Sequence, residues 1–391
     1  MAADLSAVLL PDRRVARLTV EEGRIAAVEA VDGPARAVAL PLPVDPHLHL
    51  DKTYTAQRCR ASEPGLFGAI AAMERDKIRW TEEDLRARMG RALGEIRAAG
   101  YGAVRSHVDW PEAAEPLAWR ILAEIAEERA GLAVQRAALV PIDLLGDPEA
   151  GPPIAARVAE TGGVLGAFVY RNEDLAAKLG RVFSLAERYG LRLDFHVDEG
   201  LDPEARGLDL IADLTARSEM SGRVLCGHAC SLSVLPEEEM RRSLDTAARA
   251  GLALTVMPTT NLHLQDMSPG RSPRRRGLAP MQEGRSAGLS LCLGIDNVRD
   301  PFYPHGAYDP MHVLRLAVLA AQLAPGEWLD AITTAPARAM GLPEPTLAPG
   351  APANLLLIAA RDWNEAVSDP RVPVRVIRAG RETDPAEETA R

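Results

Sequence analysis

Lysine is nearly absent from this chain, although basic residues are common. Of the 45 basic residues only three are lysines, Lys52, Lys77 and Lys178, so each of them is a candidate for a specific role. Acidic residues number 55, which gives a formal net charge of −10. An acidic chain is a poor binder of polyanions, so we expect neither nucleic acid nor an anionic membrane surface as a partner. The basic run Arg274–Arg276 is too short and isolated to change this.

Cysteine is also scarce, and none of the four cysteines forms a C-x-x-C pair, which argues against a structural zinc site. No window reaches the roughly 18 uninterrupted apolar residues of a membrane-spanning helix. The opening MAADLSAVLLPDRR has no basic region before an apolar run, so we expect no signal peptide. These features predict a reduced, cytoplasmic protein.

The rest of the composition is that of a globular protein, with 47% apolar and 26% charged residues over 391 positions. The centre of the chain alternates apolar strands with helical stretches that end in glycine, as at 81–100, 175–190 and 237–251. Eight strand candidates lie at 42–52, 101–109, 132–141, 163–170, 191–199, 222–230, 252–264 and 289–297. Eight such units predict an α/β fold, a parallel (β/α)8 TIM barrel.

Both ends of the chain differ from this pattern. The first 40 residues contain short strand candidates, including a hairpin with Gly23 in its turn, and residues 353–360 and 372–382 are similar. We therefore expect the N- and C-terminal segments, 1–43 and 343–391, to form one small β-sandwich domain. Residues 44–342 would be the barrel domain.

Histidines are concentrated where the predicted strands end, which is where TIM barrels carry their working residues. His47 and His49 are two apart on the first strand, so both imidazoles face the same side and can reach one metal ion. Other strand ends carry His107, His196, His228 and Asp296. Any one of these could be a core histidine, but the combination predicts a metal site.

Five phrases, PVDPHLHLDKT, FHVDE, CGHAC, NLHLQ and GIDNVRDPFYP, occur in an order that resembles the amidohydrolase superfamily. The similarity is greatest to its cytosine deaminase-like branch, which includes N-isopropylammelide isopropylaminohydrolase. It covers nearly the whole chain, including the phrase ITTAPARAMGL near the C-terminal end.

The resemblance implies a site for one divalent ion, Zn²⁺ or Fe²⁺ with Mn²⁺ as a further candidate, held by His47, His49, His196 and Asp296. Two-metal relatives carry a carboxylated lysine at the end of the fourth strand. Here that strand ends in GAFVY, which supports a single ion. Three imidazoles and one carboxylate suit zinc, iron or manganese.

The resemblance also assigns catalytic roles to Glu199, His228, Asp296 and Lys52. Glu199 would shuttle a proton, His228 would hydrogen-bond the attacking hydroxide, and Asp296 would accept a proton from water. Because Glu199 is three residues after His196, the strand has to end near Asp198 and turn inward. His107, Asp109 and Asp51 are expected to support the site.

Three places that read the substrate in cytosine deaminase differ here, which disfavours cytosine. Ile142 stands where a glutamine reads the pyrimidine, Asn297 replaces a second aspartate, and Tyr170 and Arg171 follow the fourth strand. We expect these four residues to contact the substrate, and Arg171 would suit an anionic group. The alternative for Arg171 is a surface ion pair with Glu173 or Asp174.

The predicted function is therefore metal-dependent hydrolysis that removes an amino, alkylamino or sulfur group from a small nitrogen heterocycle. A ring-opening cyclic amidase on the same scaffold is the alternative. A non-catalytic binding protein is disfavoured because the whole set of site residues is present. We also expect a homo-oligomer.

Overall fold

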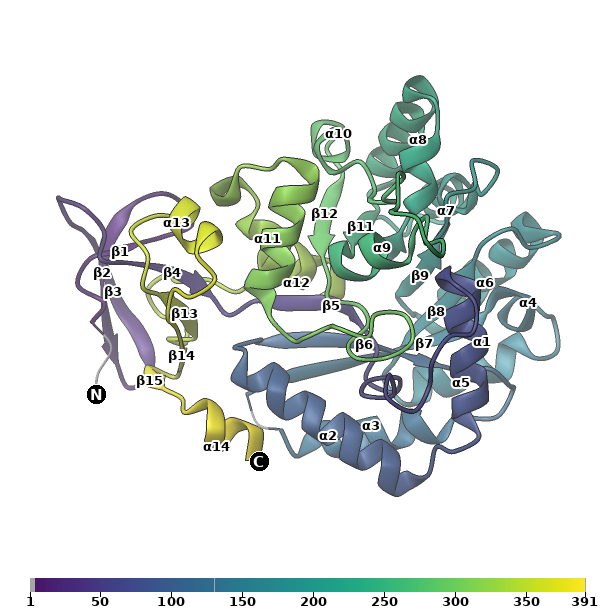
Figure 1. Ribbon diagram of the computed structural model, residues 1–391, viewed down its shortest axis with the longest axis horizontal. Coiled ribbons are helices and arrows are strands. Elements are labelled where there is room, and N and C mark those ends of the chain that lie inside the picture. Colours follow the sequence, from purple (N-terminus) through teal and green to yellow (C-terminus); the bar gives the residue numbers. More distant parts are fainter. Residues whose placement is uncertain (1–3, 130, 391) are drawn as a thin grey trace.

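Eight parallel strands form the predicted barrel in the computed structural model, which describes residues 4–129 and 131–390 (Figure 1). Each strand pairs with the next one along the chain, from first to last. The strands are β5 (Val44–Leu48), β6 (Ala103–Asp109), β7 (Ala133–Pro141), β8 (Val164–Val169), β9 (Leu193–Val197), β10 (Val224–His228), β11 (Ala253–Val256) and β12 (Ser290–Leu293).

The barrel is closed where the first strand meets the segment after the last one. The backbone N–H of Asp296 donates to the carbonyl of His47 at 2.8 Å, and Leu48 and Asp296 form a parallel bridge. The buried Asp45 carboxylate reinforces the closure, because it accepts the backbone N–H groups of His47 and Ile295, both at 2.9 Å. This junction brings His47 and Asp296 together.

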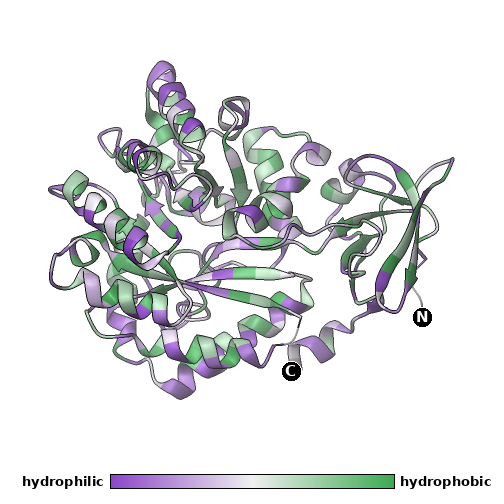
Figure 2. Ribbon diagram, turned by 180° about the vertical axis from the view of Figure 1, so that it is seen from behind, coloured by the Kyte–Doolittle hydropathy of each residue, from purple (hydrophilic) through white to green (hydrophobic). Residues whose placement is uncertain are grey.

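Helices cover the outside of the barrel (Figure 1), and Figure 2 shows that apolar and polar stretches alternate along them. The predicted helices are confirmed with slightly shorter ends, as α2 (Glu82–Ala98), α3 (Leu117–Glu127), α6 (Leu175–Tyr189), α8 (Glu237–Ala250) and α11 (Pro310–Ala321). The remaining barrel helices are α4 (Ile142–Leu145), α5 (Gly151–Glu160), α7 (Gly207–Arg217), α9 (Pro258–Leu264), α10 (Met281–Ser286) and α12 (Thr334–Met340), with 3-10 turns at Cys230–Val234, Pro325–Glu327 and Leu329–Ile332.

Helix α1 (Gly65–Lys77), which lies between β5 and α2, was not predicted. The predicted seventh strand is too long, because only Ala253–Val256 is a strand and His263 belongs to α9. In the described part of the chain, no helix is both long and apolar enough to cross a membrane.

The two ends of the chain form a second unit, as expected. Its strands make one continuous seven-stranded sheet in the order β15-β14-β13-β4-β1-β2-β3, where a sandwich was expected. The hairpin turn at Gly23 is confirmed, with a φ of 77°. The strands are β1 (Val8–Leu9), β2 (Val15–Glu21), β3 (Arg24–Ala30), β4 (Ala37–Pro41), β13 (Leu355–Ile358), β14 (Val374–Arg378) and β15 (Arg381–Glu382), followed by α14 (Pro385–Ala390), with α13 (Trp363–Ser368) between β13 and β14. The domain boundaries at 43 and 343 stay a prediction.

Gly166 in β8 tests how tightly the barrel strands pack. A Cβ atom there would lie 2.4 Å from the carbonyl oxygen of Asp194 and 2.6 Å from that of Ala138, both backbone atoms that cannot move aside. We expect Gly166→Ala to destabilise the fold by about 1–3 kcal/mol, the usual cost of overpacking. The measurement is the shift in the midpoint of urea unfolding.

Gly180→Ala is the matched control, because Gly180 lies in α6 and nothing lies within 4 Å of its Cβ position. Alanine there should raise stability by about 0.5–1 kcal/mol through its helix propensity. Equal midpoints for the two variants would contradict the packing argument.

Candidate active site

The four predicted metal ligands lie together at the C-terminal end of the barrel. The Nε2 atom of His196 is 3.0 Å from Nε2 of His47 and 3.1 Å from Nε2 of His49. Oδ1 of Asp296 lies 3.1 Å from His49 Nε2 and 3.7 Å from His47 Nε2. Ligand atoms that bind one ion at about 2.1 Å lie roughly 3.0–3.4 Å apart. The spacing therefore fits one divalent ion.

The donor atoms are also in the right chemical state for a metal. Burial lowers the pKa of His47, His49 and His196 well below the usual range, so the imidazoles are neutral, as metal binding requires. Both carboxylate oxygens of Asp296 are buried without a hydrogen-bond partner in the described part of the chain. Because such atoms are costly to bury, a cation beside Asp296 would compensate them.

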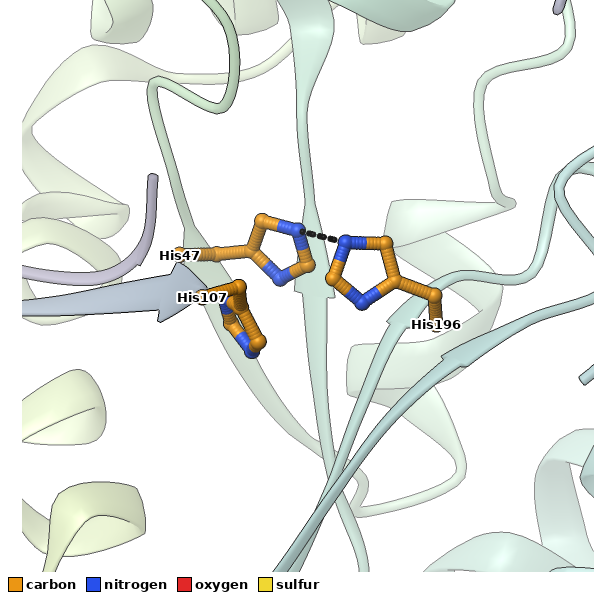
Figure 3. Close-up of side chains that lie close together, drawn as sticks. All are labelled: His47, His107 and His196. Carbon is orange, nitrogen blue, oxygen red and sulfur yellow. Dashed lines mark hydrogen bonds between the residues drawn. The ribbon is translucent and has the colours of Figure 1, made fainter. Parts of the chain in front are cut away.

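His107 lies directly beside this cluster (Figure 3). Its ring centroid is 4.1 Å from that of His47, and it could join His47 and His196 around an ion. However, its Nε2 atom is 3.1 Å from Asp194 Oδ1, and Arg105 Nη1 donates to Asp194 Oδ2 at 2.6 Å. Burial raises the pKa of Asp194, but His107 and Arg105 outweigh it and hold this pKa below its usual range. This pairing favours the supporting role predicted for His107.

Glu199 reaches the pocket through the turn that the sequence required. Strand β9 ends at Val197, and Asp198 has a left-handed φ of 51°. The Asp198 carboxylate fixes this turn by accepting the backbone N–H groups of Gly207 and Leu208, at 2.9 and 3.0 Å, at the start of α7. Glu199 therefore lines the same pocket as His196. Burial, with the nearby Asp296 charge, raises the pKa of Glu199 well above its usual range.

His228 stands opposite Glu199 at the end of β10, where its own φ is 73°. Its Nε2 atom lies 3.5 Å from Glu199 Oε2. On the other side of the ring, Asn261 Nδ2 lies 3.0 Å from Nδ1. With the amide donating to Nδ1, the ring proton is on Nε2 and points into the pocket. Asn261 lies in the phrase NLHLQ, and the sequence alone predicted no role for it.

The cluster forms the base of a pocket of about 720 Å³, a volume that includes its open mouth. Helix α1 forms one wall with Leu66, Ile70, Met73, Glu74 and Lys77. Leu66, Ile70, Met73 and Lys77 follow one another at intervals of three or four residues, and Glu74 is four after Ile70, so they share one broad helix face. This stripe is the signal by which the sequence could have revealed α1. Other walls come from Trp110, Leu139, Pro141, Phe168 and Phe302.

Lys52 occupies the place expected for a functional lysine. Its Nζ atom lies 3.2 Å from His49 Nδ1 and 2.8 Å from Asp109 Oδ1, and it lines the pocket. Asp51 does not touch a metal ligand. It accepts the backbone N–H of Asp109 at 2.9 Å and so positions the partner of Lys52.

Of the four residues predicted to contact the substrate, only Asn297 lines the pocket. Ile142 begins α4 and is fully buried in the hydrophobic core. Tyr170 packs its hydroxyl against Gly200, and Arg171 turns to the surface. Arg171 pairs there with Asp202 at 2.7 Å and Glu204 at 2.5 Å, so the surface ion pair is observed, with carboxylates other than Glu173 and Asp174. This arrangement gives no support to an anion-binding role for Arg171.

Comparison with known proteins gives consistent matches. The amidohydrolase family profile matches residues 75–383. A pterin deaminase from Rhizobium rhizogenes is 36% identical over 348 residues, which is 87% of this chain and 79% of that protein. The structure of 5-methylcytosine deaminase from Klebsiella pneumoniae with 5-fluorocytosine has a TM-score of 0.86 at 27% identity and covers 96% of both chains. N-isopropylammelide isopropylaminohydrolase from Burkholderia multivorans has a TM-score of 0.76 at 26% identity, covering 96% of this chain and 98% of that one. The predicted resemblance is confirmed.

The metal ligands can be tested by elemental analysis of purified variants. We expect one divalent ion per chain in the parent protein and its loss in His47→Ala, because that change removes a central donor. His305→Ala is the control, since His305 is exposed. His107→Asn should retain the ion. Loss of metal in His107→Asn to the same extent as in His47→Ala would make His107 a ligand.

Proposed function

The chain belongs to the amidohydrolase family, and we propose that it is a metal-dependent deaminase that hydrolytically removes the exocyclic amino group of a pterin-like heterocycle. The observation that carries the proposal is the 36% identity to a pterin deaminase across 87% of this chain. The pocket is consistent with it, because apolar and aromatic side chains line its walls and polar groups gather at its base, as in sites for small heterocycles.

We propose that His47, His49, His196 and Asp296 hold the ion, with Zn²⁺ or Fe²⁺ as first candidates and Mn²⁺ as the third. An ion bound there would lower the pKa of a water molecule towards about 7 and so supply hydroxide at neutral pH.

Beside the proposed metal site, Glu199 would transfer a proton and His228 would stabilise negative charge. The raised pKa of Glu199 favours the protonated carboxyl, which can donate a proton to a ring nitrogen or to the departing amine. The Nε2–H group of His228 points into the pocket, where it can stabilise negative charge that develops on oxygen. Lys52, beside His49, would bind a polar atom of the substrate ring.

The product identifies the reaction. We expect release of ammonia with the ring intact from a pterin, in a panel that also contains cytosine, triazines, hydantoins and thiohydantoins. An opened ring would instead identify a cyclic amidase, and the absence of any turnover by the metal-loaded protein would favour a binding protein. Cytoplasmic location and homo-oligomeric assembly stay predictions.

The proton-transfer role of Glu199 predicts a loss of rate without a loss of metal. Glu199→Gln should lower kcat by about 10²–10⁴-fold, the usual contribution of a positioned general acid or base. Glu204→Gln is the matched control, because Glu204 lies in the same loop with its side chain 72% exposed. Turnover of Glu199→Gln near the parent rate, with metal content unchanged, would exclude the proposed role.

A further inference from the structure

Two of the three lysines in the chain converge on a single carboxylate in the pocket wall. Lys52 Nζ lies 2.8 Å from Asp109 Oδ1, and Lys77 Nζ lies 2.8 Å from Asp109 Oδ2. Both lysines line the pocket, although their side chains are only 5% and 16% exposed. In a chain that otherwise uses arginine, this pair calls for a specific explanation.

The two ammonium groups stand at different depths. Lys52 follows β5 and touches His49, so it lies beside the metal ligands. Lys77 comes from the last turn of α1 and reaches the pocket from the covering helix, on the far oxygen of Asp109. The pocket therefore has two ammonium groups, the inner one of Lys52 and the outer one of Lys77, and each contacts a different oxygen of the Asp109 carboxylate.

Each ammonium keeps a hydrogen-bond donor for a ligand. An ammonium group has three N–H donors. Lys77 has two partners, Asp109 and Glu74, and Lys52 has Asp109 and His49. One N–H group of each lysine has no partner in the described part of the chain. Because both lysines line the pocket, these N–H groups are available to an oxygen atom of the substrate, and the positive charge would strengthen such a hydrogen bond.

Apolar and aromatic side chains line the pocket next to these donors. Lys52 Nζ lies 5.4 Å from the ring centroid of Phe302, and Met73, one turn before Lys77, also lines the pocket with Trp110. A planar ring system between such walls would place its edge against the two lysines. Lys52 is the nearer of the two lysines to the proposed metal ligands, since it contacts His49, whereas Lys77 lies at the other oxygen of Asp109.

We propose that Lys77 is a specificity-determining residue that binds an oxygen acceptor on the second ring of a fused bicyclic substrate. In this arrangement Lys52 donates a hydrogen bond to the ring whose amino group is removed, and Lys77 donates one to the second ring. This inference rests on the proposed deamination of pterins and narrows it to pterins with a carbonyl or carboxylate on the pyrazine ring.

The test compares kcat/KM for ammonia release from pterin, 7-oxopterin and pterin-6-carboxylate. We expect the parent enzyme to have a higher kcat/KM for 7-oxopterin or for pterin-6-carboxylate, which carry oxygen on the pyrazine ring, than for pterin itself. Lys77→Met should lower that preference ratio by about 10–100-fold, as expected for the loss of a charged hydrogen bond. Lys178→Met, which removes the third lysine at its surface pair with Asp143, should leave the ratio unchanged.

The outcomes separate the two proposals. If Lys77 only fastens α1 to Asp109, its removal will lower kcat/KM for all pterins equally, and an unchanged ratio overturns the inference alone. A parent enzyme that prefers neither 7-oxopterin nor pterin-6-carboxylate over pterin also overturns the inference. A parent enzyme that deaminates no pterin overturns the proposed function and the inference with it. If Lys77→Met does not fold, Lys77→Gln, which keeps a donor for Asp109, is measured in the same way.

Discussion

The closure of the barrel between β5 and the segment after β12 is the contact on which the site depends. One backbone hydrogen bond, from Asp296 to His47, joins residues that are 249 positions apart and are both proposed metal ligands. The Asp45 carboxylate secures the same junction with two further backbone bonds. Burial raises the pKa of Asp45 to about 7. The barrel thus closes and assembles the site in a single place.

Positive φ angles at the ends of the barrel strands orient the other side chains of the site. Asp198, His228 and Asp296 have φ values of 51°, 73° and 68°, in a region that residues with side chains seldom adopt. Each follows or ends a barrel strand, and each turn directs a side chain into the pocket or fixes the position of the next one. Such strain is concentrated at functional sites because the surrounding fold can hold it there. Here the holding contacts include the start of α7 and the barrel closure.

The sequence predicted those parts of the molecule whose signals are local. The eight strands were visible as apolar runs. The shared orientation of His47 and His49 could be predicted because side chains two residues apart on a strand point to the same face. The inward turn at Asp198 was also expected. What could not be predicted depends on where distant segments pack. Helix α1 has glycines at 65 and 68 and little helical signal apart from its pocket-facing stripe, so Lys77 stood out only as a rare lysine and could not be placed in the pocket. Arg171 was expected in the pocket because it follows a barrel strand, but carboxylates at 202 and 204, remote in sequence, hold it at the surface.

The small sheet has a consequence for how the protein is made on the ribosome. Strand β4 pairs with β13, with Val38 opposite Ile358, so its partner is synthesised 320 residues later. At about 5–20 residues per second, this strand edge stays uncovered for roughly a quarter of a minute to a minute. Its residues Ala37–Pro41 are all buried in the finished protein, which makes the nascent edge a natural target for chaperones. The seven-stranded sheet therefore cannot be completed until the C-terminal strands have been synthesised.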